Sequence, residues 1–134
     1  MKLRRLGQTN VYETQVGLEC MGFSHAYGVA EDKQKAIDTI QKAYDLGYNF
    51  FDTAECYTVV NVDGSISYNE EIVGEALKDV RDKVVIATKF GVMHKGDHLE
   101  FDSSPETIRR SIEGSLKKLQ IILIYIISIE LIHK

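Results

Sequence analysis

The sequence predicts an α/β fold built on a parallel sheet, and three observations carry this prediction. Strand-like apolar segments alternate with segments of helical periodicity. Residues 84–87 are a continuous apolar run, typical of a strand covered on both faces. Asp52 and Lys89 stand at the C-terminal ends of two consecutive predicted strands, where parallel α/β folds place their active sites. The 134 residues suffice for one domain with a real core.

The N-terminal part predicts a hairpin, a short strand and a helix. Residues 3–6 and 11–17 flank a turn, and residues 16–18 lead into a second short strand followed by a Gly-containing loop over residues 21–28. The helix begins near Glu31 and Asp32, whose charges favour a helix N-terminus, and it ends at Gly47. Its apolar face consists of Ala36, Ile37, Ile40, Ala43 and Tyr44.

The middle of the chain predicts a strand, a loop and a second helix. Residues 48–51 form the strand that ends at Asp52, and residues 58–68 form a polar loop with a turn at Asp63 and Gly64. Asn69 is positioned to cap the helix over residues 69–77. The buried stripe of this helix consists of Ile72, Val73, Ala76 and Leu77.

The C-terminal part predicts a further strand and helix. The strand over residues 84–89 ends at Lys89, and a loop over residues 91–102 follows. Ser104 is positioned to cap a helix with Pro105 at its first position. The predicted face of this helix consists of Ile108, Ile112, Ser115, Leu116 and Leu119. Residues 121–127 are apolar but too few to span a membrane, so they predict a buried parallel strand.

Composition and motifs exclude several classes of function. The net charge of -4 offers no basic face for nucleic acid. Cys20 and Cys56 are too few and too far apart for a zinc site or a disulfide framework, and no secretory signal opens the chain, so we expect a cytoplasmic protein without membrane contact. No Gly-x-Gly-x-x-Gly or phosphate loop occurs, and His94 and His98 have no obvious third ligand, so no metal site is expected.

Asp52, Tyr57 and Lys89 form the candidate catalytic set. A phenol donates a proton poorly at neutral pH unless a nearby ammonium stabilises its anion, and the ammonium needs a carboxylate to hold it. Lys89 and Asp52 can fill these two roles for Tyr57 from adjacent strand ends. The alternative is that Tyr57 is a loop aromatic and that Asp52 and Lys89 form a structural ion pair. Cys56 has no neighbouring His in sequence that would make it a nucleophile.

At these residues the sequence resembles the aldo-keto reductase family. Residues 17–22 look like the family's first-strand motif, and residues 50–57 look like its motif running from the active-site Asp to the Tyr. The resemblance continues, in the family's order, over residues 69–77, 87–90 and 113–119.

The resemblance implies the fold and the chemistry. It implies a partial (β/α)₈ TIM barrel, with the N-terminal hairpin, the first three βα units and a substitute terminal strand. It also implies NADPH-dependent reduction of aldehydes or ketones, with Tyr57 as proton donor, Lys89 lowering its pKa, and Asp52 paired with Lys89. By position, Met21, Gly22, Phe23 and Asp52 would belong to the cofactor-binding residues, near the nicotinamide and the small-molecule carbonyl substrate.

The family's fourth catalytic side chain, a His at the end of strand four, has no counterpart here. One nucleotide string encodes a family-like Asp-Tyr-Ile-Asp-Leu-Tyr-Tyr-Gln-His-Arg-Ile-Asp-Pro in one frame and residues 121–132, followed by a codon that allows His133, in the next. We therefore hypothesise a frameshift near Gln120, with residues 1–120 as the N-terminal part of the barrel and residues 121–134 as a non-family apolar tail. Such a fragment is expected to be inactive and poorly soluble.

Two other functions stay open at this point. One is a catalytically silent interaction module, similar to the reductase-like accessory subunits of potassium channels. The other is a flavodoxin-like nucleotide binder, which the absence of a phosphate-cradling pattern in the first loop disfavours.

Overall fold

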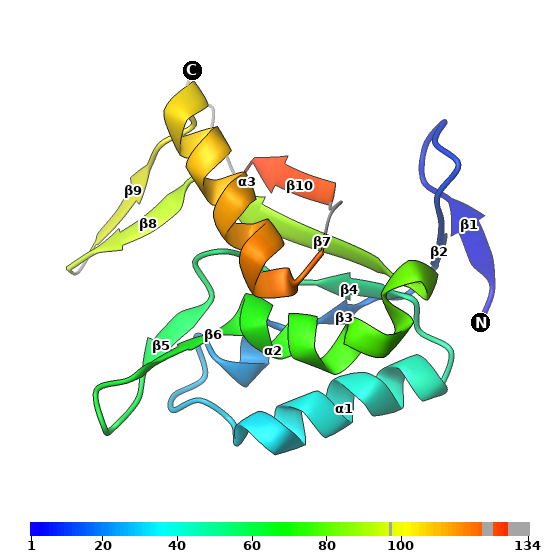
Figure 1. The fold of residues 1–134 in the computed structure, drawn as a ribbon, viewed down its shortest axis with the longest axis horizontal. Helices are drawn as coiled ribbons and strands as arrows, with labels where there is room; N and C mark the ends of the chain where they lie inside the picture. The colour runs from blue at the N-terminus through cyan, green and yellow to red at the C-terminus, as the bar shows by residue number, and fades with distance from the viewer. Residues whose placement is uncertain (97, 122–124, 129–134) are drawn as a thin grey trace.

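A four-stranded parallel sheet is the centre of the fold (Figure 1). The strands lie in the order β10–β7–β4–β3, so each consecutive strand of the sheet is the neighbour of the one before it. Their bounds are β3 (Leu18–Glu19), β4 (Phe50–Asp52), β7 (Val85–Phe90) and β10 (Tyr125–Ser128). The computed structural model describes residues 1–96, 98–121 and 125–128. Within them the sheet is open, and the prediction of an α/β fold with a parallel sheet is confirmed.

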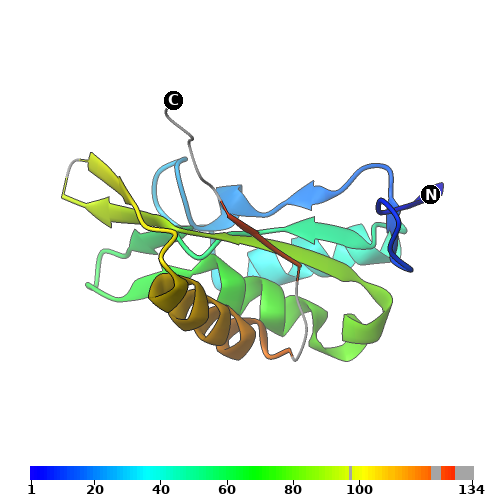
Figure 2. The ribbon, with the colours of Figure 1, turned by 90° about the horizontal axis from the view of Figure 1, so that it is seen from above.

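Three helices connect these strands and lie together on one side of the sheet (Figure 2). They are α1 (Lys33–Asp45), α2 (Asn69–Leu77) and α3 (Pro105–Leu119). Helix α1 packs on α2, and α2 packs on α3. Two short 3-10 turns accompany them, η1 (Met21–Phe23) after β3 and η2 (Lys78–Lys83) after α2. Among the described residues, no helix covers the opposite face of the sheet.

An N-terminal hairpin closes the end of the sheet at which the strands begin. Strand β1 (Leu3–Arg5) pairs antiparallel with β2 (Tyr12–Thr14), as predicted. Asn49, directly before β4, fixes it there: its Oδ1 accepts from the Thr14 backbone N–H at 2.6 Å, and its Nδ2 donates to the Tyr12 carbonyl at 3.0 Å. The C-terminal ends of β4 and β7, which carry Asp52 and Lys89, lie at the opposite end of the sheet.

Both predicted loops are hairpins, which corrects the sequence-based prediction. In residues 58–68, β5 (Thr58–Val60) pairs with β6 (Ile66–Tyr68). In residues 91–102, β8 (Val92–Lys95) pairs with β9 (His98–Phe101). Their apolar runs are short and interrupted by polar residues, so periodicity did not reveal them, although the turn at Asp63 and Gly64 is a hairpin signal. Asp97 and the His94 side chain lie outside the described part.

Of the two predicted helix caps, Ser104 is confirmed and Asn69 is wrong, while Asp32 is a cap that was not predicted. The Asp32 carboxylate accepts from the Lys35 N–H at 3.0 Å at the start of α1. Ser104 accepts from the Thr107 N–H at 3.3 Å, with Pro105 opening α3. Asn69 does not cap α2: it is the first helical residue, and its side chain bonds instead to the ends of β3 and β4.

The core lies between the sheet and the helices. The predicted stripes of α1 and α2 are buried, except that Tyr44 is only half-buried. The core side chains are Cys20, Ala36, Ile37, Ile40, Ala43, Phe51, Ile72, Val73, Ala76, Leu77, Val84, Ile86 and Leu119.

The predicted face of α3 is rotated relative to the one observed. Its fully buried residues are Thr107, Ser111, Ser115 and Leu119. The predicted Ile108, Ile112 and Leu116 are only partly buried. The buried side chains other than Leu119 are small, which lets α3 approach α2 and β7 closely.

Strand β10 confirms the predicted terminal strand where the structure describes it. Tyr125 pairs with Ala87 and Ser128 with Phe90, in parallel. The remainder of the predicted tail, residues 122–124 and 129–134, lies outside the described residues. No helix in the described part of the chain is long and apolar enough to cross a membrane.

Gly74 is the closest point of contact between α2 and α3, which gives a stability prediction. A Cβ at Gly74 would lie 2.7 Å from the Lys118 carbonyl oxygen and 2.8 Å from the Leu119 Cα, both backbone atoms that cannot rotate away. We expect Gly74→Ala to lower the free energy of unfolding by about 2 to 3 kcal/mol, measured by urea denaturation. The matched control is Gly114→Ala in α3, where a Cβ meets only the flexible Lys118 Nζ at 3.7 Å. It should be neutral or stabilise by up to about 1 kcal/mol, and equal effects at both positions would contradict the packing argument.

Candidate active site

The strand register places three ionisable side chains on the open face of the sheet. Glu19 pairs with Asp52, and Asp52 pairs with Ala87, two residues before Lys89. Because side chains alternate along a strand and neighbouring partners share a face, Glu19, Asp52 and Lys89 point to the same side. The neighbouring Phe51 and Ile86 point to the helices and are buried in the core. The alternation therefore separates the polar cluster from the packed core.

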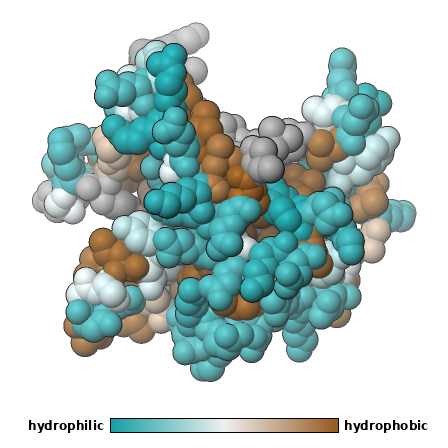
Figure 3. All heavy atoms as spheres, viewed as in Figure 1, coloured by the Kyte–Doolittle hydropathy of each residue, from teal (hydrophilic) through white to brown (hydrophobic). Residues whose placement is uncertain are grey.

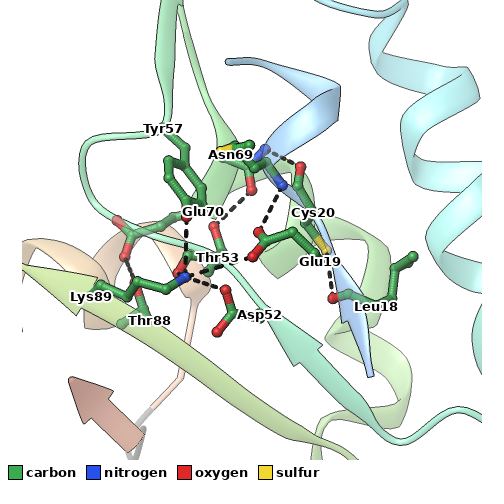
Figure 4. Close-up of polar contacts among 11 residues, drawn as sticks. Leu18, Glu19, Cys20, Asp52, Thr53, Tyr57, Asn69, Glu70, Thr88 and Lys89 are labelled. Atoms are coloured by element: carbon green, nitrogen blue, oxygen red, sulfur yellow. Dashed lines mark hydrogen bonds and ion pairs between the residues drawn. The ribbon is translucent and has the colours of Figure 1, made fainter. Parts of the chain in front are cut away.

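Lys89 is the centre of this cluster (Figure 4). Its Nζ donates to Asp52 Oδ1, to the Thr53 carbonyl at 2.9 Å and to Tyr57 Oη at 3.2 Å. These three acceptors match the three N–H groups of an ammonium. The same nitrogen lies 4.9 Å from the centroid of the Tyr57 ring. Tyr57 accepts from Lys89, so the proton of its own hydroxyl stays free for another acceptor.

The environment shifts the pKa values of both Lys89 and Tyr57. Burial lowers the pKa of Lys89, but its bonds to Asp52 and Tyr57 and the charges of Asp52 and Glu19 outweigh this, so the pKa is raised and the amine stays charged. Burial of the phenol raises the pKa of Tyr57, and Lys89 opposes this through its hydrogen bond and its charge. Lys89 thus acts in the predicted direction, but the net pKa of Tyr57 lies above its usual value because burial and the two carboxylates prevail.

Asn69 ties together the segments that carry the cluster. Its side chain is 1% exposed, and Oδ1 accepts from Thr53 Oγ1 at 2.7 Å. Its Nδ2 donates to the Cys20 carbonyl at 2.7 Å and to Ser24 Oγ at 2.8 Å. Its backbone N–H donates to the Tyr57 carbonyl at 3.0 Å. One buried amide at the start of α2 therefore holds the ends of β3 and β4 and the loop that carries Tyr57.

Glu70, the next residue, anchors β7 from the helix side. Its carboxylate is 1% exposed; it accepts from Thr88 Oγ1 at 2.8 Å and lies 3.4 Å from Lys118 Nζ. A buried carboxylate needs such partners, because an unpaired one is costly. Thr88 directly precedes Lys89, so the pair of Glu70 and Thr88 fixes the strand from which Lys89 projects.

Three of the four residues predicted to bind a cofactor form the turn η1 beside the cluster, and the fourth, Asp52, ends β4. The Met21 N–H donates to Glu19 Oε1 at 3.0 Å, Gly22 is exposed, and Phe23 packs on the edge of the core. A Cβ at Gly22 would meet only the Tyr27 ring, at 3.5 Å. The turn therefore presents an accessible backbone next to the open sheet face.

Sequence reasoning missed three residues that contact this site. Glu19 lies 3.9 Å from Lys89 Nζ, and Asn69 is the buried hub described above. The His25 ring stacks on the Tyr57 ring, with centroids 5.5 Å apart and planes at 22°, and its Nδ1 lies 3.1 Å from the Thr58 carbonyl oxygen. The signal available for Glu19 was its place at the end of a strand next to the one that ends at Asp52.

Two other candidate chemistries gain no support in the described residues. Burial raises the pKa of both Cys20 and Cys56, so both stay protonated thiols at neutral pH rather than nucleophilic thiolates. No group of three His, Cys, Asp or Glu side chains in the described part could hold a metal ion. A hollow of about 670 Å³ lies at the opposite end of the sheet, next to Tyr12 and Asn49, and contains none of the cluster.

Removing the Asn69 side chain should disturb the ends of β3 and β4 more than an ordinary surface substitution. We expect Asn69→Ala to lower the free energy of unfolding by about 3 kcal/mol, because it leaves buried polar groups without partners. Chemical denaturation measures this loss. The control is Asn61→Ala in the β5–β6 hairpin, whose side chain bonds to Ser65 and Ser67 near the surface and should cost less than about 1 kcal/mol. Similar losses at both positions would contradict the role of Asn69 as a hub.

Comparison with known proteins places this geometry in a family. The sequence model of the Aldo/keto reductase family matches residues 20–130. The chain is 36% identical over 119 residues to the "Probable aldo-keto reductase 1" of Glycine max, covering 87% of this chain and 32% of that protein. It is 37% identical over 125 residues to the L-galactose dehydrogenase of Arabidopsis thaliana, covering 90% and 35%. The chain thus spans about a third of the length of these curated relatives.

Solved structures agree with the sequence comparison. A putative aldo-keto reductase from Pseudomonas aeruginosa superposes with a TM-score of 0.79 at 31% identity, covering 94% of this chain and 46% of that one. An aldo-keto reductase from Bacillus halodurans, in its holo form, gives 0.75 at 31% identity, covering 92% and 38%. The open sheet is therefore part of a (β/α)₈ barrel, and the chain belongs to the aldo/keto reductase family.

Proposed function

We propose that this chain carries the proton-donating half of an NADPH-dependent carbonyl reductase centre. The observation that carries the proposal is the Lys89 ammonium, which touches Asp52 and the Tyr57 hydroxyl at once. The reaction class is reduction of a small aldehyde or ketone to an alcohol. When bound, the nicotinamide cofactor supplies the hydride that adds to the carbonyl carbon.

Tyr57 is the proposed proton donor to the carbonyl oxygen. Its hydroxyl accepts from Lys89 and so directs its own proton away from the ammonium. As the oxygen takes up negative charge, the Tyr57 O–H bond breaks and the phenolate formed is stabilised by Lys89 at 3.2 Å. Asp52 keeps Lys89 charged and in place, because its carboxylate is the closest partner of the ammonium.

The described residues fit a flat ring beside Tyr57 better than they fit phosphate groups. The exposed backbone at Gly22 and the open face at Asp52 leave room for such a ring. A phosphate group would need a free hydrogen-bond donor, but the three N–H groups of Lys89 already donate to Asp52, Thr53 and Tyr57. Met21, Gly22, Phe23 and Asp52 are therefore the proposed contacts of the nicotinamide end alone.

These 134 residues on their own are proposed to turn over negligibly. They correspond to 32% of one curated relative and 46% of one solved structure, so much of the surface that aligns hydride and carbonyl in those proteins has no counterpart here. Alignment of reactants is worth about 7 to 11 kcal/mol in well-oriented reactions.

Relatives named L-galactose dehydrogenase and glycerol dehydrogenase indicate that hydroxylated carbonyl compounds belong in the substrate panel.

A chimeric enzyme tests the role of Tyr57. Residues 1–121 are joined to the remaining part of the Glycine max relative, and NADPH consumption is followed by absorbance with a panel of aldehydes and ketones. In an active chimera, Tyr57→Phe should lower kcat/KM by about 100-fold or more, since the proton donor is lost. Tyr12→Phe, at an exposed position of the N-terminal hairpin, should leave it unchanged. An active chimera whose rate survives Tyr57→Phe would refute the proposal.

Cofactor titration of the chain itself tests the second part of the proposal. NADPH is added to the 134-residue protein and its fluorescence is followed, with a complete reductase of the family as the positive control. We expect no saturable binding below about 1 mM, since the chain spans only about a third of the length of its curated relatives. Micromolar binding would show that these residues suffice to hold the cofactor and would overturn this part of the proposal.

A further inference from the structure

Lys89 has two carboxylates around it, not one. Besides Asp52, Glu19 Oε2 lies 3.9 Å from Lys89 Nζ, and the two acidic residues are direct neighbours in the register of β3 and β4. The other oxygen of Glu19, Oε1, accepts from the Met21 N–H at 3.0 Å. Figure 4 shows the Glu19 side chain directed toward the Lys89 ammonium beside Asp52. Glu19 therefore contacts both the ammonium and the turn η1.

We propose that Glu19 is a positioning residue, a second carboxylate that ties Lys89, and through it the Tyr57 hydroxyl, to the turn Met21–Phe23. This inference deepens the proposed function and rests on it for its catalytic meaning. The contacts themselves are properties of the chain as it stands, so they can be tested without any turnover.

The charge balance gives the direction of the effect. The ionisable groups that face the cluster are Glu19 from β3, Asp52 from β4, Lys89 from β7, and Tyr57 with His25 from the loops. With both carboxylates ionised, Glu19, Asp52 and Lys89 together carry one more negative than positive charge. The Glu19 charge opposes ionisation of Tyr57, whereas the Lys89 charge favours it. Glu19 thus offsets part of the effect of Lys89 on the Tyr57 phenol.

Glu19 responds in turn to its neighbours. Burial, and then the proximity of the acidic Asp52, raise the pKa of Glu19, while the Met21 N–H and Lys89 lower it. Protonation of Glu19 removes one negative charge from the cluster, and loss of the Met21 bond frees the carboxylate to move.

The first test measures the ionisation of Tyr57 in the complete 134-residue chain. Tyrosine is labelled with 13C at Cζ, the Tyr57 signal is assigned with Tyr57→Phe, and the signal is followed against pH. Glu19→Gln keeps an acceptor for Met21 but removes the charge, so the Tyr57 titration should move down by about half a pH unit at low salt, and by less at high salt. Glu113→Gln, an exposed position on α3 that removes the same charge, should cause no shift. Equal shifts in both variants, or none in either, would overturn the proposal.

A second test avoids strongly alkaline solution. The 13C signal of the Glu19 carboxyl is followed through mild acid in the wild type and in Asp52→Asn. We expect a Glu19 titration above the usual Glu range in the wild type, and a lower one in Asp52→Asn, because the repulsion between the two carboxylates is lost. The Met21 amide signal should move in Glu19→Ala but stay in Glu19→Gln. A Glu19 carboxyl that titrates in the usual Glu range and does not change in Asp52→Asn would overturn the proposal. This outcome would not affect the proposed function of Tyr57.

Discussion

The ion pair between Lys89 and Asp52 is the interaction on which the candidate site at the C-terminal end of the sheet depends. Each side chain is largely removed from water, with 17% and 20% of its surface exposed. Taking both charges out of water costs free energy that their attraction repays only partly, whereas removing one partner of a buried pair costs about 3 to 5 kcal/mol. The pair therefore adds little to the free energy of folding, but once one of the two charges is buried, the other is needed to avoid the larger cost of an unpaired charge. Such an arrangement is expected where a charge serves chemistry rather than folding.

Strand alternation explains how the chain combines this polar cluster with a packed core. Phe51 and Asp52 are consecutive, yet one enters the core and the other the open face. The same holds for Thr88 and Lys89, since Thr88 bonds to Glu70 of α2 while Lys89 bonds to Tyr57. A shift of β7 by one residue would exchange these partners and destroy both the core and the cluster. The hydrogen bond from Thr88 to the buried Glu70 of α2 helps to fix the register of β7.

The sequence predicts the parallel sheet, the three helices and the acidic and basic strand ends, because each depends on local patterns such as Asp32, Ser104 and Pro105 at helix starts. It does not predict the two hairpins, whose strands of three or four residues are too short for a clear period. It also misplaces Asn69, since a side chain at a helix start can cap the helix or reach elsewhere, and only the tertiary structure decides. The face of α3 was misjudged for a related reason. Ser111 and Ser115 are buried because close contact favours small side chains, not because they are apolar.

The position of α2 has a consequence for how this protein tolerates change. Its first residue, Asn69, bonds to the segments that follow β3 and β4, and Gly74, in its second turn, packs directly against α3. The same short helix thus makes the hydrogen bonds of Asn69 at its N-terminus and the close packing contact of Gly74 little more than one turn later. A substitution that tilts α2 to relieve crowding at Gly74 would also move Asn69, and with it the ends of β3 and β4. Substitutions in the packing between α2 and α3 are therefore coupled to the geometry of the candidate site. During evolution, a change in one is expected to require a compensating change in the other.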